Sequence, residues 1–117
     1  MGLYNFHRRF VPFIKNGTKK HTIRAERCHP DKAGNTLHLY QGLRTKKAKL
    51  IKRVECVKIE QIYIYRDFQT EVEIAGVPLT VSEKESLARR DGFKDFAEMM
   101  DFWCGRLPFH GQIIHWK

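Results

Sequence analysis

The chain has 117 residues, 42% of them hydrophobic, and 14 aromatic side chains (8 Phe, 4 Tyr and 2 Trp). This composition excludes a disordered segment and is typical of a single folded domain over residues 1–117. The 22 lysines and arginines outnumber the 13 acidic residues, so the net charge of +9 favours a polyanionic partner such as nucleic acid.

The distribution of apolar residues argues against a membrane protein. No run approaches the roughly 18 apolar residues of a membrane span, and the N-terminal sequence MGLYNFHRR lacks the apolar core of a signal peptide. The cysteines, Cys28, Cys56 and Cys104, are odd in number and widely separated. We therefore expect a cytoplasmic protein with reduced, buried thiols.

The first predicted elements are a short helix and a strand. Apolar residues recur at helical spacing at Phe6, Phe10, Phe13 and Ile14. Pro12 suits the first turn of a helix that begins near Val11 and ends at Asn16, and Gly17 is its expected left-handed cap. Residues 21–25 then have the pattern of a strand.

Strands also dominate the middle of the chain. Residues 27–35 are rich in turn formers, residues 36–40 alternate as a second strand, and residues 48–65 form one long strand or a strand pair. Residues 68–81 have the pattern of a hairpin with Ala75–Gly76 at its turn.

Two helices and a final strand complete the expected order. Ser82 and Glu85 have the spacing of a capping box, and this helix is expected to end at Asp91–Gly92. A second helix over residues 94–104 has an apolar stripe that we assign to the core, and residues 111–116 form the last strand. This order predicts an α+β fold, a small β-barrel of about five or six strands with two or three short helices at its openings.

A short motif gives a family resemblance. Gly17, Lys19, Thr22 and Arg24 stand at the spacing of Gly-x-Lys-x-x-Thr-x-Arg, and "AGNTLHLYQGLRT", "ECVKIEQI" and "LARRDGF" follow in order. The chain resembles the ASCH family of the PUA-like superfamily over nearly its whole length. The resemblance implies a PUA-like barrel and a partner that is RNA or a modified nucleoside.

One branch of that family implies a specific reaction. The bacterial amidohydrolases that deacetylate acetylated cytidine use a Lys, a Thr and an acidic residue. Lys19 and Thr22 match the first two, and Asp91 is the nearest equivalent of the acid, which is Glu in that branch. The resemblance implies no cofactor for this chemistry.

The residue chemistry agrees with these roles. A threonine nucleophile needs a base, and a lysine acts as a base only when its pKa lies well below its free value of ~10.4. Lys20 and Arg24 repel the Lys19 charge and lower that pKa. In a strand Thr22 and Arg24 face one side, so Lys19 reaches Thr22 only from a bend, which Gly17 explains.

Further cations widen the candidate binding surface. Six of the ten residues from Arg44 to Arg53 are basic, which is typical either of a nucleic-acid contact or of a solvated strand face. The expected ligand-binding residues are Gly17, Lys20, Arg24, Arg44, Lys46, Lys47 and Lys49. The spacing of the other Cys and His residues fits no zinc site, so no metal is expected.

Several alternatives stay open at this point. Lys19 is also explained as an exposed turn lysine, and Asp91–Gly92 as an ordinary helix end. A non-catalytic RNA-binding module is the main alternative to the hydrolase, because a free nucleoside needs no large positive charge. Ribonuclease activity is a third alternative, although no histidine pair is placed for it.

Overall fold

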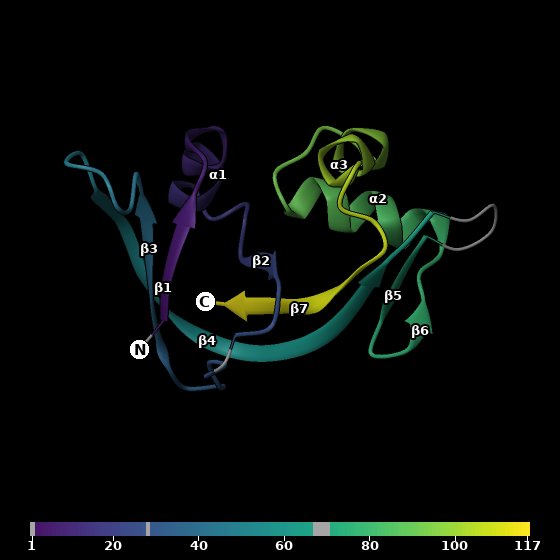
Figure 1. Cartoon of the computed structure of the whole chain (residues 1–117), viewed down its shortest axis with the longest axis horizontal. Helices are drawn as coiled ribbons and strands as arrows, with labels where there is room; N and C mark the ends of the chain where they lie inside the picture. Colours follow the sequence, from purple (N-terminus) through teal and green to yellow (C-terminus); the bar gives the residue numbers. More distant parts are fainter. Residues whose placement is uncertain (1, 28, 67–70) are drawn as a thin grey trace.

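A computed structural model describes residues 2–27, 29–66 and 71–117, and its organising element is the 16-residue strand β4 (Lys49–Ile64). The first half of β4 pairs antiparallel with β3 (Thr36–Gln41), and its second half pairs antiparallel with β7 (Phe109–Trp116). The end of β4 also pairs with β5 (Val72–Ile74), which forms a hairpin with β6 (Val77–Pro78). Figure 1 shows β4 curving beneath the whole molecule.

Two short strands complete a mixed sheet of seven strands in the described part of the chain. β1 (Gly2–Phe6) lies parallel to β3, and β2 (His21–Arg24) lies antiparallel to β7. β1 was not expected from the sequence, because Phe6 was assigned to the helical spacing that follows it. Its alternating burial, with Tyr4 and Phe6 in the core, is nevertheless that of a half-buried strand.

The sheet does not close into the expected barrel. Within the described residues no backbone pairing joins β1 to β2, so the closed form of the prediction is not confirmed. Side chains span this seam instead: Arg24 Nη2 donates to the Asn5 carbonyl oxygen over 2.5 Å, and Arg27 Nη2 donates to the Leu3 carbonyl oxygen over 2.6 Å.

The helices lie on the inner side of the curved sheet (Figure 1). A single 3₁₀ turn (Arg8–Phe10) leads into α1 (Val11–Lys15), and α2 (Val81–Arg90) is followed by α3 (Phe96–Trp103). The core between sheet and helices is apolar, with Ile14, Leu87 and Met99 almost completely buried. An α+β fold with short helices is therefore confirmed.

The predicted turns are confirmed, whereas the predicted N-cap of α2 is not. Gly17 has the expected left-handed backbone (φ +83°), and Ala75 and Gly76 form the expected turn. The predicted cap of α2 was wrong: Thr80 is the N-cap, and it forms the capping box with Glu83 instead of Ser82 with Glu85. Part of the predicted 68–81 hairpin, residues 68–70, lies outside the described residues.

The cysteines also differ in part from expectation. Cys56 is buried and reduced, as predicted, but Cys104 is exposed at the end of α3 because it lies just past the apolar stripe of that helix. Cys28 lies outside the described residues.

The helices are short: α2, the longest that the structure describes, has ten residues. None of the described helices combines the length and the apolar character that a membrane-crossing segment needs.

Candidate active site

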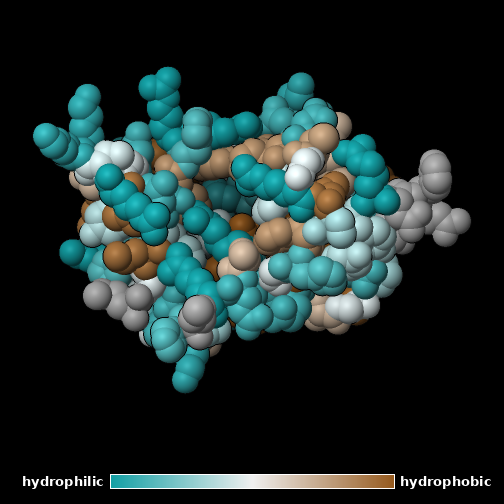
Figure 2. Space-filling view, viewed as in Figure 1, coloured by the Kyte–Doolittle hydropathy of each residue, from teal (hydrophilic) through white to brown (hydrophobic). Residues whose placement is uncertain are grey.

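A cavity of about 410 Å³ lies between the α1 region, β2 and the α2–α3 helices. Figure 2 shows a hollow near the centre of this face of the molecule. Four of the residues predicted to form the site, Lys19, Thr22, Arg24 and Asp91, line this cavity together although one of them is far away in sequence. The other lining residues are Asn5, Phe6, His7, Phe10, Ile23, Phe102, Trp103 and Arg106.

Lys19 enters the cavity from the bend that follows Gly17. The Lys19 backbone nitrogen donates to the Phe13 carbonyl oxygen over 2.9 Å, which fixes the chain just before β2. The bend turns the side chain inward, where it is 3% exposed. The interpretation of Lys19 as an exposed turn lysine is therefore wrong.

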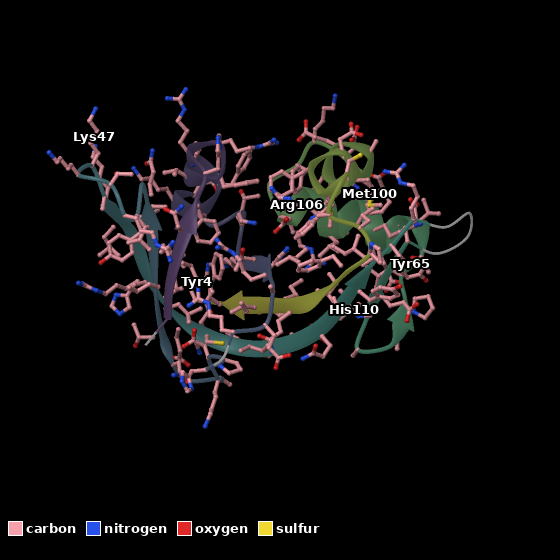
Figure 3. The ribbon with its side chains drawn as sticks, viewed as in Figure 1. Tyr4, Lys47, Tyr65, Met100, Arg106 and His110 are labelled. Atoms are coloured by element: carbon pink, nitrogen blue, oxygen red, sulfur yellow. The ribbon has the colours of Figure 1, made fainter. Side chains whose placement is uncertain are left out.

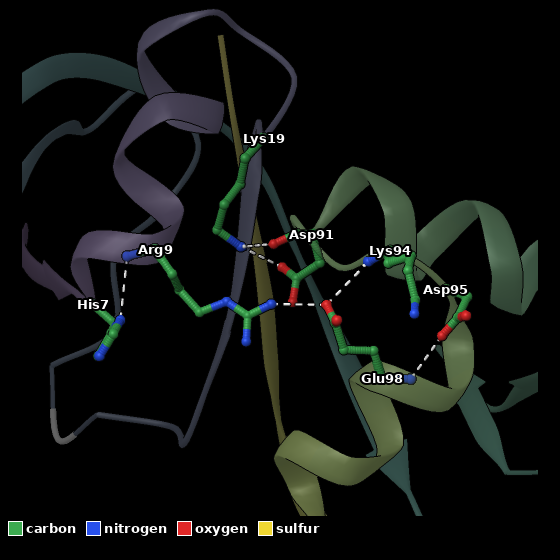
Figure 4. A network of polar contacts seen from close by, with 7 residues as sticks. All are labelled: His7, Arg9, Lys19, Asp91, Lys94, Asp95 and Glu98. Carbon is green, nitrogen blue, oxygen red and sulfur yellow. Dashed lines mark hydrogen bonds and ion pairs between the residues drawn. The ribbon is translucent and has the colours of Figure 1, made fainter.

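Asp91 meets Lys19 from the end of α2. Asp91 is the C-cap of this helix, and Gly92 continues the chain with a φ of +103°. A side chain at Gly92 would come within 2.9 Å of the Phe10 ring, so glycine allows the helix end to pack against the α1 region. Lys19 Nζ donates to Asp91 Oδ1 over 2.5 Å and to the Asp91 carbonyl oxygen over 2.8 Å (Figure 4).

The pKa values of Lys19 and Asp91 are both lowered in this buried pair. Burial lowers the pKa of Lys19 below its ordinary value, and the Asp91 charge only partly offsets this. Burial opposes ionisation of Asp91 as well, but the nearby Lys19 ammonium and His21 outweigh it and lower the pKa of Asp91. Asp91 is therefore ionised at neutral pH, while Lys19 releases its proton more easily than an exposed lysine.

Thr22 and Arg24 form the other polar wall of the cavity. They alternate with Ile23 along β2, as expected for residues two apart in a strand. Arg24 Nε donates to Thr22 Oγ1 over 3.1 Å. The Arg24 guanidinium also lies 4.9 Å from the centre of the Phe6 ring, and burial together with the nearby Arg27 lowers its pKa. Arg24 thus holds the hydroxyl oxygen of Thr22 at a fixed position.

His21 belongs to the polar cluster although the sequence did not single it out. Its Nε2 lies 3.1 Å from Asp91 Oδ1, a distance that allows an ion pair, but without the alignment of a hydrogen bond. His21 is 2% exposed and pairs across the sheet with His115, whose Nε2 bonds Glu60 Oε1 over 2.9 Å. Its position between Lys20 and Thr22 in sequence was the available signal.

The rim of the cavity comes from elements that are distant in sequence. Arg106, labelled in Figure 3, follows α3. Its guanidinium lies over the rings of Phe102 and Trp103. Arg9 of the 3₁₀ turn donates to Glu98 Oε1 of α3 over 2.8 Å (Figure 4). This contact joins the 3₁₀ turn to α3, the two elements whose neighbouring residues Phe10, Phe102 and Trp103 line the cavity. Sequence spacing offered no signal for these residues, because each side of the rim is assembled from a different part of the chain.

The remaining predicted ligand-binding residues lie outside this cavity. Lys20 is exposed, and Gly17 shapes the bend without lining the cavity. Lys46, Lys47 and Lys49 are exposed near the β3–β4 turn, and Lys47 extends from the far end of the molecule (Figure 3). Arg44 lines a smaller neighbouring cavity that shares Arg24 with this one.

Comparisons with known proteins do not identify the chain: it matches no family model, no curated protein and no solved structure. In the described part of the chain, no three His, Cys, Asp or Glu side chains gather as a metal site requires. Function is therefore inferred from the geometry of the cavity.

Proposed function

We propose that this protein is an amidohydrolase that removes an acyl group from the amine of an acylated nucleoside, such as acetylated cytidine. The single observation that supports this proposal best is the enclosure of Thr22, Lys19 and Asp91 in one cavity. In this proposal the fold is an ASCH-type, PUA-like barrel whose seam between β1 and β2 is spanned by Arg24 and Arg27.

The hydrogen bonds of Lys19 orient the side chain for the role of a base. A neutral amine has two N–H groups and one lone pair. Both donors of Lys19 are directed to Asp91, one to Oδ1 and one to the backbone carbonyl oxygen. When Lys19 is neutral, its lone pair is thus left to accept a proton. Asp91 acts as a positioning residue for the base.

The reaction then follows from the cavity walls. Thr22 Oγ1 attacks the acyl carbon while its proton moves to Lys19 Nζ. The tetrahedral intermediate breaks the C–N bond, and Lys19 returns the proton to the leaving amine. Water then hydrolyses the acyl ester on Thr22 with the same base. The guanidinium of Arg24 stabilises the negative charge that develops on oxygen.

Substitution of the base tests the proposal. Purified protein is incubated with acetylated cytidine, and cytidine is measured by chromatography. Lys19→Arg should reduce the rate by roughly 100- to 10,000-fold, because a guanidinium keeps its proton near neutral pH. Lys20→Arg, at the exposed neighbouring position, is the matched control and should retain the rate.

Substitution of the nucleophile gives a second test. Thr22→Val should be at least as damaging as Lys19→Arg, while Thr22→Ser should retain some rate because it keeps a hydroxyl. Asp91→Asn should slow the reaction, and Asp91→Glu tests whether a longer acid is accepted. Hydrolysis that survives in Lys19→Arg would disprove the role of Lys19 as base.

A non-catalytic RNA-binding module is the second candidate. The net charge of +9 and the exposed lysines of the β3–β4 turn favour it. A wild-type protein that hydrolyses no acylated nucleoside, but binds RNA and loses it on Arg24→Ala, would support this candidate over the enzyme.

A further inference from the structure

Three arginines surround a second cavity, of about 240 Å³, beside the candidate active site. Arg24 comes from β2, Arg27 follows that strand, and Arg44 lies in the turn between β3 and β4. The remaining lining residues are Leu3, Asn5 and Leu43, so the lining contains no acidic side chain. Three positive charges around one small cavity repel one another. An anion bound between them would offset this repulsion.

In the described part of the chain, no carboxylate lies within ion-pair distance of these three arginines. None of the three forms an ion pair there, and the carboxylate of the nearby Asp31 accepts the Tyr4 hydroxyl over 2.7 Å. Arg24 and Arg27 each donate to a backbone carbonyl oxygen of β1. A guanidinium has five N–H groups, so both retain donors for a further acceptor.

Arg44 distinguishes an anion site from a simple bridge across the seam. The contacts of Arg24 and Arg27 are sufficient to span the gap between β1 and β2. The Arg44 side chain lines the cavity but makes no hydrogen bond or ion pair in the described structure. The turn that carries Arg44 is attached to β1, because the Leu43 backbone nitrogen donates to Asn5 Oδ1 over 2.9 Å. Arg44 itself has a φ of +73°, a conformation that a non-glycine residue adopts at some cost.

The two cavities are adjacent, because Arg24 and Asn5 line both. A ligand that fills both would place an anionic group among the three arginines and another group beside Thr22 and Lys19. Arginine pairs with phosphate through parallel, charge-assisted hydrogen bonds, which makes phosphate the anion that this set of donors fits best.

We propose that the cavity of Arg24, Arg27 and Arg44 binds a phosphate group of the substrate. The inference rests on the proposed function only for the identity of the group in the larger cavity. It makes the substrate a nucleotide, or a nucleotide within an RNA strand, instead of a free nucleoside. A mononucleotide and an RNA strand present the same phosphate chemistry, and the experiment below separates them.

Calorimetric titration tests this inference without relying on catalysis. The probes are cytidine, cytidine 5′-monophosphate, cytidine 3′-monophosphate, inorganic phosphate and a short single-stranded RNA. We expect at least one nucleotide to bind ten or more times tighter than cytidine. Tighter binding of a monophosphate than of the RNA per site indicates a mononucleotide substrate, and the reverse indicates RNA.

A double variant assigns the effect to the cavity. In Arg27→Gln/Arg44→Asn the affinity ratio of nucleotide to cytidine should fall to about one, since each lost charge-assisted contact costs about tenfold. Asparagine tolerates the left-handed backbone at position 44, which protects the fold. The control Arg89→Gln/Lys94→Gln removes two exposed cations near α2 and α3 and should keep the ratio.

The outcomes are distinct from those that test hydrolysis. Equal binding of cytidine and every phosphorylated probe by the wild type would overturn the inference, and so would an unchanged ratio in the double variant. Phosphate-dependent binding that needs Arg27 and Arg44, in a protein that hydrolyses no acylated substrate, would retain this inference and reject the proposed reaction.

Discussion

At the scale of single residues, two opposing effects act on the pKa of Lys19. Its burial favours the neutral amine that a base must be, while its hydrogen bonds to Asp91 stabilise the ammonium. The net effect is a lowered pKa of Lys19, because burial outweighs the interaction with Asp91. The proposed base is the neutral form of Lys19, and the fraction of Lys19 in this form increases as the pH rises.

This balance predicts the pH dependence of hydrolysis. The neutral fraction of Lys19 grows tenfold per pH unit below its pKa, so log kcat/KM should rise with unit slope. It should then level off below pH 10.5, the ordinary value for lysine, since burial lowers the pKa. Asp91 stays ionised throughout, because its pKa is lowered. A rate that falls as the pH rises from 6 to 9 would contradict the assignment.

The same pair predicts a pattern of stability. Asp91→Asn leaves the buried Lys19 ammonium without its counterion and should reduce the free energy of unfolding by about 3–5 kcal/mol. Lys19→Met/Asp91→Asn removes both charges and should be more stable than Asp91→Asn alone. Urea denaturation at pH 7 measures both variants. Destabilisations that simply add in the double variant would show that the two residues do not interact.

The sequence predicts part of this site for a clear physical reason. Lys19, Thr22 and Arg24 lie within six residues, so one bend and one strand suffice to relate them. Asp91 could be predicted because it ends a helix that the sequence pattern indicates. Arg106 and Trp103 were missed, because they reach the cavity through the packing of α3, and no local pattern encodes that packing.

At the scale of elements, α2 shows how tertiary contacts select between equivalent local signals. Thr80–Glu83 and Ser82–Glu85 have the same capping-box spacing. Glu85 is not available for a cap, because its Oε2 accepts the backbone N–H of Phe96 over 3.0 Å at the start of α3. Glu83 is free to accept the Thr80 N–H over 2.9 Å, so the N-cap lies two residues earlier than predicted.

Substitutions at the two hydroxyls distinguish these caps. Thr80→Ala should reduce the free energy of unfolding by about 1 kcal/mol, because it removes the acceptor for the Glu83 backbone N–H. Ser82→Ala, at the exposed second position of the helix, should stay within about 0.5 kcal/mol of the wild type. Chemical denaturation of both variants compares them directly. An effect of Ser82→Ala that equals that of Thr80→Ala would contradict the observed cap.

Elements with strong local periodicity were predicted more reliably than those held by distant pairing. β4, α3 and the Ala75–Gly76 turn are visible in sequence as alternation, an apolar stripe and a turn signal. β1 has only five residues and pairs in parallel with a strand more than thirty positions away. Closure of the sheet likewise depends on pairing between segments that are distant in sequence. The local sequence pattern therefore could not show that the sheet stays open between β1 and β2.

At the scale of the whole molecule, the charge is distributed along an elongated shape of 43 × 26 × 24 Å. Lys47 of the β3–β4 turn extends from one end, away from Arg106 (Figure 3). If the protein binds RNA as proposed, we expect a strand that extends from the candidate active site toward the lysines of this turn to pass the three-arginine cavity, which contains Arg44 of the same turn.

Salt dependence tests whether the lysines contact RNA. The logarithm of the affinity for single-stranded RNA should fall with the logarithm of salt concentration by about 0.7 per phosphate neutralised. Lys46→Ala/Lys47→Ala/Lys49→Ala should flatten this slope by about two. Fluorescence anisotropy at several salt concentrations measures the slope. If the slope does not change, the three lysines form a solvated face.

The arginine contacts at the seam have a further consequence for solubility. Leu3 and Asn5 lie two apart in β1, so their carbonyl oxygens point out of the same edge, away from β3. An edge strand with unoccupied acceptors is a template on which another chain can add a strand and begin to aggregate. Because Arg27 and Arg24 occupy these two acceptors, the edge of β1 is blocked to intermolecular strand addition by side chains of its own molecule.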